Sequence, residues 1–175
     1  LVGSEMCIRD RPYEEKDIDV VIMMDCSLCP INDERKDSFY KYVKKHSETI
    51  RSKGIEPILF MSWPYKNKPE MQEMLEKEFF KASKLNNLRL IPAGQAFLYI
   101  NKNFPKINLY TEDLRHPSKE GTYLAALMVF TSLSNKSPIG NTFMMGLDPE
   151  VAEILQKVAW KTYENFQIRV MNSDL

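Results

Sequence analysis

The sequence has no excess of charge of either sign, no long apolar run, and only two histidines and three cysteines. Lysine and arginine together number 24, as do aspartate and glutamate, so the formal net charge is zero. Nucleic-acid-binding domains usually carry a basic patch. Because no basic stripe interleaved with aromatics occurs here, we expect no nucleic-acid partner. No apolar run reaches the ~18 residues that a membrane-spanning helix needs, so we expect no membrane association.

The first eleven residues differ in character from the rest of the chain. Residues 1–11 show neither helical nor strand periodicity and look like a translated adaptor leader, so we treat them as a non-native segment. Residues 12–175 are long enough for one domain with a sizeable core, and 43% of the whole chain is hydrophobic. We therefore expect a single domain whose natural amino terminus is missing, and the sequence does not indicate a cellular compartment.

Three short apolar runs alternate with longer amphipathic segments. The runs at 18–24, 57–63 and 88–92 predict strands. The first is rich in β-branched residues, which is typical of a strand buried on both faces inside a parallel sheet. Apolar stripes, caps and breakers predict helices over 33–54, over 69–85, over about 94–103, from Ser118 to about Leu133, and from Pro149 onward.

Strands that alternate with helices in this way indicate parallel βαβ crossovers. The sequence therefore predicts an α/β fold in three layers, with a parallel sheet between two layers of helices. Ligands of such folds bind at the carboxyl ends of the strands. The residues that fall at this edge are Ser27, Trp63, Tyr65, the 92–94 segment, Asp113 and His116.

Asp113 and His116 form the most informative motif in the chain. A neutral imidazole can take a proton from a hydroxyl nucleophile, and it does so best when a carboxylate holds its other nitrogen in the donor tautomer. Pro117 disfavours the α region for His116, so we expect the histidine on an extended turn, with Ser118 capping the helix that follows. The alternative is a solvated surface pair with a weak charge interaction.

Two other residues at this edge are candidate substrate contacts. Trp63 could form a wall of the pocket, although a large aromatic residue at a strand end more often serves packing. Ser27 follows the first strand and lies at the same edge, where Ser27 or Cys26 could conceivably act as a nucleophile for His116. The second histidine, His46, lies among lysines on a helix face, and we expect it to be a solvated residue without a chemical role.

Cys26 and Cys29 form a C-x-x-C motif between a strand and a helix, which is the placement used by thiol–disulfide oxidoreductases. The helix is expected to begin only near Asp33, so its dipole would do little to activate a cysteine there. A structural zinc site needs four ligands, and the chain offers one close cysteine pair. We expect both cysteines to be small buried or half-buried residues, and keep the oxidoreductase as an alternative.

Taken together, these segments resemble the SGNH (GDSL-like) serine hydrolases, whose last motif is D-x-x-H followed by proline. The histidine block matches most specifically, as His116-Pro117-Ser118 and then the run 121–126. Other segments that resemble one bacterial branch of the superfamily are Met24-Asp25-Cys26-Ser27, Met61-Ser62-Trp63 and Pro92-Ala93-Gly94-Gln95-Ala96. The resemblance covers roughly residues 19–160.

This resemblance implies a flavodoxin-like α/β/α fold and a Ser-His-Asp triad, with Asp113 and His116 as its catalytic acid and base. The family carries its serine in a G-x-S motif after the first strand, and no such motif occurs here. The visible strands would then be the third, fourth and fifth, with the amino-terminal strands missing. The branch also has amide side chains where this chain has Met24, Asp25 and Cys26. An ionised carboxylate there cannot donate to an oxyanion.

The resemblance implies an ester hydrolase that acts on an acyl or acetyl ester, such as a carbohydrate ester, without a cofactor or a metal. A chain that lacks the serine would be inactive alone. The alternatives are the oxidoreductase that uses Cys26 and Cys29, and a non-catalytic binding domain that kept the pocket but lost the chemistry. Asn32-Asp33 is similar to an Asn-Asp motif of other family members, but its distance from the strand favours a helix-start turn.

Overall fold

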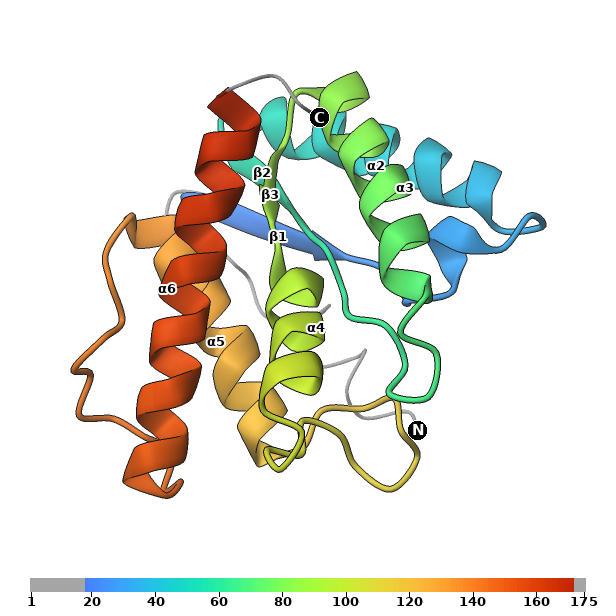
Figure 1. The fold of residues 1–175 in the computed structure, drawn as a ribbon. Helices are drawn as coiled ribbons and strands as arrows, with labels where there is room; N and C mark the ends of the chain where they lie inside the picture. The colour runs from blue at the N-terminus through green and yellow to red at the C-terminus, as the bar shows by residue number, and fades with distance from the viewer. Residues whose placement is uncertain (1–17, 172–175) are drawn as a thin grey trace, which may run out of the picture.

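The computed structural model describes residues 18–171, so the leader expected over residues 1–11 lies outside the described residues. Strands and helices alternate along the chain as the sequence predicts (Figure 1). The elements are β1 (Val20–Met24), the 3-10 helix η2 (Cys29–Ile31), α2 (Lys36–Arg51), β2 (Glu56–Phe60), α3 (Met71–Asn86), β3 (Arg89–Ile91), α4 (Ala93–Asn103), α5 (Lys119–Ser134) and α6 (Pro149–Met171).

The three strands form a parallel sheet in the order β1-β2-β3, which confirms the predicted α/β architecture. Side chains on one face of the sheet, including Ile58 and Ile91, pack against α4, α5 and α6. Side chains on the other face, including Leu59 and Leu90, pack against α2 and α3. Because alternate residues of a strand point to opposite faces, β2 and β3 each contribute side chains to both cores.

The prediction that the first strand is buried on both faces is wrong for the described part of the chain. β1 pairs only with β2, so it is an edge strand of the described sheet. Ile22 is 37% exposed and Met24 is 65% exposed. Strand burial depends on what lies on each side of the strand, and that cannot be read from the apolar run itself.

Several element boundaries differ from the prediction. The second strand ends at Phe60 and not at Trp63. After it, the Met61 N–H donates to the carbonyl of Ile91 at the end of β3, and the Met61 carbonyl accepts from the N–H of Gly94 in α4. On α3, Met74 and Leu85 continue the expected apolar stripe, yet they are 45% and 67% exposed. The stripe is wider than the surface that α3 buries.

The start of α2 also shifts, from Asp33 to Lys36. The Asn32 carbonyl accepts hydrogen bonds from the backbone N–H groups of Arg35 and Lys36, and its side-chain oxygen accepts one from that of Glu34. Asn32 therefore forms the helix-start turn that the sequence predicts.

Two helix caps follow the prediction. The Ser118 hydroxyl accepts a hydrogen bond from the backbone N–H of Gly121 at 3.2 Å, so Ser118 caps α5. The Asp148 carboxylate accepts hydrogen bonds from the backbone N–H groups of Glu150 and Val151 at the start of α6. Each cap satisfies donors that a helix leaves free at its first turn.

Gly121 allows α5 to approach the segment that leads into the Asp113/His116 turn. A Cβ atom at Gly121 would lie 2.2 Å from the backbone oxygen of Leu109. That oxygen also accepts a hydrogen bond from the Ser118 backbone N–H. The absence of a side chain at Gly121 therefore allows α5 to lie this close to the backbone of Leu109.

None of the helices in residues 18–171 combines the length and the apolar character needed to cross a membrane.

The exposed apolar edge of β1 leads to a first prediction. An edge strand that presents unpaired backbone groups and apolar side chains promotes association between chains. We expect the chain to be poorly stable alone and to associate reversibly, and Ile22→Lys to reduce that association in analytical ultracentrifugation. Leu85→Lys, which alters an equally apolar but helical surface position, should leave association unchanged. A cooperative melt of a monomer at all concentrations would contradict this prediction.

The close approach at Gly121 leads to a second prediction. Gly121→Ala should lower the free energy of unfolding by about 3 kcal/mol, because a backbone oxygen, unlike a flexible side chain, cannot move aside cheaply. The neighbouring exposed residue provides the control, since Thr122→Ala should change stability by less than about 0.5 kcal/mol. Urea denaturation of the two variants measures the difference, and equal midpoints would show that the helix does not need this approach.

Candidate active site

Asp113 and His116 lie on a turn closed by backbone hydrogen bonds at the carboxyl edge of the sheet. Tyr110 and Pro117 form an antiparallel bridge at the base of this turn. Within it, the Thr111 N–H donates to the His116 carbonyl at 2.9 Å. His116 thus stands outside α5, as the following proline predicts. Leu114 adopts a positive φ of 61°, so the chain reverses sharply between the two candidate catalytic residues.

The Asp113 carboxylate organises the turn. Its Oδ1 atom accepts hydrogen bonds from the backbone N–H groups of His116 and Arg115, both at 2.9 Å, and from the Thr111 hydroxyl at 2.8 Å. Its Oδ2 atom pairs with Nδ1 of the His116 ring. The His116 and Arg115 backbone donors, with the imidazole and the hydroxyl, hold the pKa of Asp113 well below its usual range. The carboxylate is therefore ionised throughout the neutral range.

The His116 ring is oriented at one nitrogen and open at the other. Nδ1 faces Asp113, so the neutral ring carries its proton on Nδ1 and leaves Nε2 as an acceptor. Nε2 has no hydrogen-bond partner among the described residues, and 72% of the side chain is exposed. The ring can therefore accept a proton from a group that approaches from solvent or from another segment.

The loop after β2 holds the Asp113/His116 turn through two hydrogen bonds. Trp63 donates from its indole nitrogen to the Arg115 carbonyl at 2.9 Å. The backbone N–H of Lys66 donates to the Leu114 carbonyl, also at 2.9 Å. Trp63 in turn stacks on Phe97 of α4, with ring centroids 4.2 Å apart. Trp63 is thus a packing residue that holds the turn, and its role as a wall of a substrate pocket stays a prediction.

Tyr110 is a further support that the sequence analysis missed. Its buried hydroxyl donates to the Pro64 carbonyl at 2.9 Å and accepts from the Asn101 amide at 3.0 Å. Burial raises the pKa of Tyr110 to about 12. The hydroxyl links the turn to the loop after β2. No sequence signal marks this role, because the contact joins residues 46 positions apart.

Ser27 makes no hydrogen bond with the candidate catalytic residues in the described part of the chain. Ser27 lies half-buried in the turn after β1, and no hydrogen bond connects it to Asp113 or His116.

The 92–94 segment begins α4 at the same edge, where a Cβ atom at Gly94 would lie 2.4 Å from the Ser62 carbonyl. Gly94 therefore allows tight packing beneath the loop that carries Trp63.

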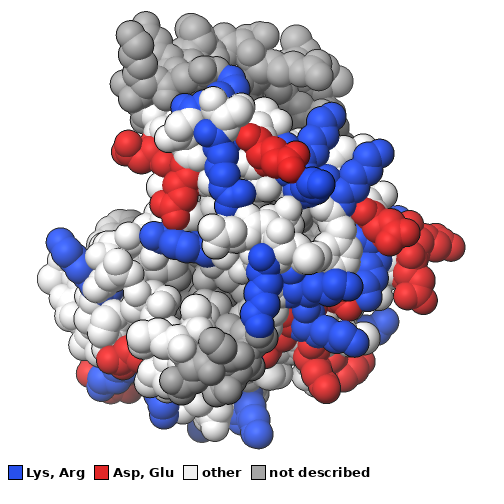
Figure 2. All heavy atoms as spheres, turned by 90° about the horizontal axis from the view of Figure 1, so that it is seen from above, with Lys and Arg blue, Asp and Glu red and all other residues white. Residues whose placement is uncertain are grey.

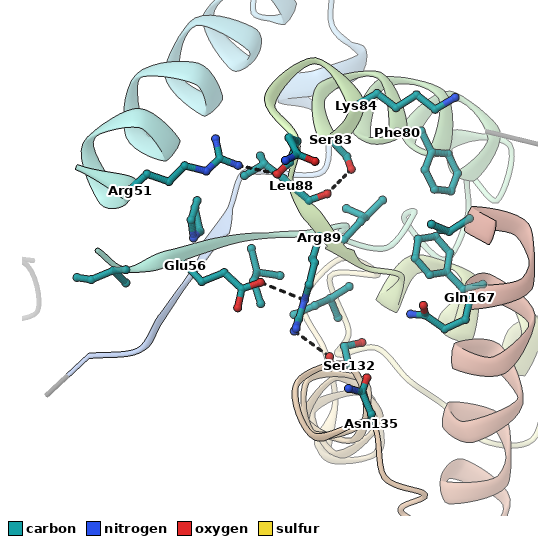
Figure 3. A pocket seen from close by; sticks show the side chains of 18 residues that line it. Arg51, Glu56, Phe80, Ser83, Lys84, Leu88, Arg89, Ser132, Asn135 and Gln167 are labelled. Atoms are coloured by element: carbon teal, nitrogen blue, oxygen red, sulfur yellow. Dashed lines mark hydrogen bonds and ion pairs between the residues drawn. The ribbon is translucent and has the colours of Figure 1, made fainter. Parts of the chain in front are cut away.

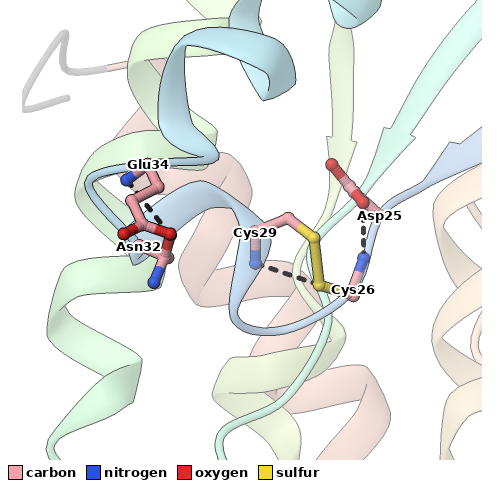
Figure 4. The surroundings of a disulfide bond; sticks show 5 residues. All are labelled: Asp25, Cys26, Cys29, Asn32 and Glu34. Atoms are coloured by element: carbon pink, nitrogen blue, oxygen red, sulfur yellow. Dashed lines mark hydrogen bonds between the residues drawn. A yellow bond between two sulfur atoms is a disulfide. The ribbon is translucent and has the colours of Figure 1, made fainter.

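The expectation for the cysteine pair is corrected in one respect. Cys26 and Cys29 form a disulfide, and Cys26 is exposed (Figure 4). Asp25 lies beside them, and the three potential metal-ligand atoms are within 4.8 Å of one another. A metal would need free thiolates at these positions. While the sulfurs are joined, this cluster does not provide a metal site.

A cavity of about 740 Å³ opens at the opposite edge of the sheet (Figure 3). Glu56 and Arg89, the first residues of β2 and β3, line it and are paired with each other at 3.3 Å. Arg51 reaches across to bond the carbonyls of Asn86 and Asn87 at the end of α3. Glu56 and Arg89 thus neutralise one another and Arg51 caps a helix, and neither Asp113 nor His116 lines the cavity.

The surface around the fold shows both signs of charge. On the face seen in Figure 2, basic and acidic side chains lie next to one another, in keeping with the equal numbers in the sequence. The absence of a nucleic-acid partner stays a prediction.

Comparison with solved structures identifies two similar proteins. A DUF4886 family protein from Bacteroides uniformis gives a TM-score of 0.71 at 21% identity, over 91% of this chain and 65% of that protein. A protein from Slackia heliotrinireducens that is described as a candidate SGNH hydrolase gives a TM-score of 0.57 at 23% identity. That match covers 66% of this chain and 65% of the other protein. The fold is SGNH-like.

The chain therefore spans about two thirds of the length of either of these proteins. No protein-family model matches the sequence, and a search of curated proteins finds no significant match. At these identities the likeness concerns the fold alone. The roles of individual residues in this chain therefore rest on its own geometry.

The pairing of His116 with Asp113 leads to a third prediction. Two-bond ¹H–¹⁵N correlation spectra, recorded at a pH where the imidazole is neutral, should show His116 protonated at Nδ1. Asp113→Asn should abolish this preference, because its amide nitrogen cannot accept the Nδ1 proton. The asparagine oxygen can still accept the backbone N–H groups of the turn, whereas Asp113→Ala should lose both sets of bonds.

His46 serves as the internal control for this measurement. It is exposed on α2 and stacks on Tyr42 at 5.8 Å, and no carboxylate is paired with it in the described part of the chain. His46 should keep its spectrum in both Asp113 variants. Identical tautomer signals for His46 and His116 would show that the carboxylate does not orient the ring.

Proposed function

We propose that this chain is the His-Asp part of a serine-type ester hydrolase whose nucleophile lies in a segment that precedes it. The observation that carries this proposal is the His116 imidazole, oriented at Nδ1 by an ionised Asp113 and open at Nε2. A general base needs this arrangement, because the orienting carboxylate sets the tautomer and stabilises the imidazolium that forms. The SGNH-like fold supports the same assignment.

The proposed reaction proceeds through an acyl-enzyme. Nε2 of His116 takes the proton of a serine hydroxyl as the serine oxygen attacks the ester carbonyl carbon, and then donates that proton to the leaving alcohol. A water molecule, deprotonated by the same nitrogen, releases the acid and restores the serine. Asp113 stays ionised throughout and stabilises the positive charge on the ring.

The unpaired edge of β1 is consistent with a nucleophile that lies in a preceding segment. β1 has no partner on its outer side in the described sheet, so a strand of a preceding segment can pair there. In a sheet of order 2-1-3-4-5, the strand on that side is the first, and its carboxyl end meets the edge that carries His116. The sequence itself contains no G-x-S motif.

The substrate that we propose is a small acyl or acetyl ester, with carbohydrate esters as one class. Ser27 and Trp63 remain the proposed substrate contacts, although Trp63 is partly covered by Phe97. Asp25 occupies a position where an ionised carboxylate repels a developing oxyanion. The oxyanion donors must therefore be backbone N–H groups, or side chains of the preceding segment.

A fourth prediction tests this function on a longer protein that includes the coding sequence upstream of this chain. It should hydrolyse p-nitrophenyl acetate, and His116→Ala should lower kcat by about 10³-fold or more. Asp113→Asn should also lower kcat, by up to roughly 10⁴-fold, since the imidazole remains but loses its orientation. The chain alone should show no turnover above background.

The matched control is His46→Ala, which removes the other histidine of this chain and should leave kcat and KM unchanged. Full activity in His116→Ala would rule out this histidine as the base. A longer protein that binds esters without hydrolysing them would instead favour a non-catalytic binding domain. An upstream reading frame with no glycine-flanked serine after an apolar run would also contradict the proposal.

A further inference from the structure

The Cys26–Cys29 disulfide joins the loop after β1 to Cys29, the first residue of η2, and closes a ring of four residues (Figure 4). The Cα atoms of the two cysteines are 5.4 Å apart. The loop is attached to the fold on its far side, where Pro30 is buried and Ile31 packs against the core formed by α2 and α3. The disulfide itself is thus at the surface, on a base that is held in place.

The two cysteines differ in exposure and in their hydrogen bonds. Cys26 is exposed, whereas Cys29 is half-buried. The backbone N–H of Cys29 donates to the Cys26 sulfur at 3.0 Å. A backbone donor aimed at a sulfur stabilises the thiolate form of that sulfur once the disulfide is reduced. Cys26 therefore combines access to solvent with stabilisation of the nucleophilic form.

We propose that Cys26 and Cys29 are an exchange-active couple that reacts with low-molecular-weight thiols and disulfides. In the reduced chain, the Cys26 thiolate attacks a disulfide R–S–S–R, forms a Cys26–S–S–R mixed disulfide and releases one R–S⁻. The Cys29 thiolate then attacks the Cys26 sulfur, expels the second R–S⁻ and forms the Cys26–Cys29 bond. Two electrons pass from the two cysteines to R–S–S–R, which becomes two thiols, and the reverse sequence reduces the chain.

Asp25 moderates this reactivity. Its Oδ1 accepts the backbone N–H of Cys26 at 2.7 Å, and its carboxylate lies within 4.8 Å of both sulfurs. A negative charge so close disfavours a second negative charge on Cys26. Replacement by asparagine keeps the backbone hydrogen bond but removes the charge. Asp25→Asn should therefore raise the rate at which the free Cys26 thiol attacks a disulfide.

The fifth prediction uses the full chain with Cys7→Ser, so that only this couple can react. The probe is bis(2-hydroxyethyl) disulfide, which is uncharged, and the products are followed by intact mass and peptide mapping. With Cys29→Ser, a mixed disulfide should accumulate at Cys26. It should form roughly tenfold faster than the adduct at Cys29 in the Cys26→Ser variant. Asp25→Asn added to Cys29→Ser should speed the reaction several-fold further.

The reduced chain with both cysteines should pass to the internal disulfide without accumulating the mixed species. Across glutathione redox buffers, its oxidised fraction should change with the ratio of the two glutathione forms. Equal or reversed rates at Cys26 and Cys29 would overturn the assignment of roles. A disulfide that stays fully oxidised in reduced glutathione would show a structural disulfide only, and would overturn the proposal. None of these outcomes depends on ester hydrolysis.

Discussion

The hydrogen bonds of the Asp113 carboxylate are the interaction on which the candidate site depends. One oxygen accepts two backbone N–H groups and a hydroxyl, which fixes the turn, and the other oxygen holds the His116 ring. The same donors hold the pKa of Asp113 below its usual range, and its place at the surface also favours the ionised form. A surface Asp-His pair is usually mobile and weak, but this one is part of a closed turn, and its geometry does not rely on burial.

Side chains from distant parts of the chain contact that turn and hold it in place. Trp63 holds the Arg115 carbonyl, Tyr110 holds the Pro64 carbonyl, and Gly121 brings α5 against the strand-like segment before the turn. The rings of Trp63 and Tyr110 both contact Phe97, which stacks on Trp63 and lies edge-on to Tyr110. The imidazole is thus exposed while its backbone is anchored to the core. A base that must meet a group from another segment requires both properties.

Local rules were sufficient for the parts of the fold that short-range chemistry decides. Pro117 and Ser118 predicted the extended turn and the helix cap, and alternating apolar runs predicted the parallel sheet. Features that depend on distant neighbours were not predictable from the sequence. Tyr110 contacts a residue 46 positions away, and Met74 and Leu85 are exposed because α3 buries a narrow face. The Cys26–Cys29 bond requires a loop that brings two Cα atoms to 5.4 Å.

The most direct test of the central claim is covalent labelling of the longer protein with a fluorophosphonate, which reacts with a serine hydroxyl that a neighbouring base activates. Our account predicts a single labelled serine in the segment upstream of this chain. Labelling should be lost in His116→Ala and retained in His46→Ala. Absence of labelling, or labelling that persists without His116, would contradict the claim that this imidazole, held by Asp113, activates a hydroxyl nucleophile.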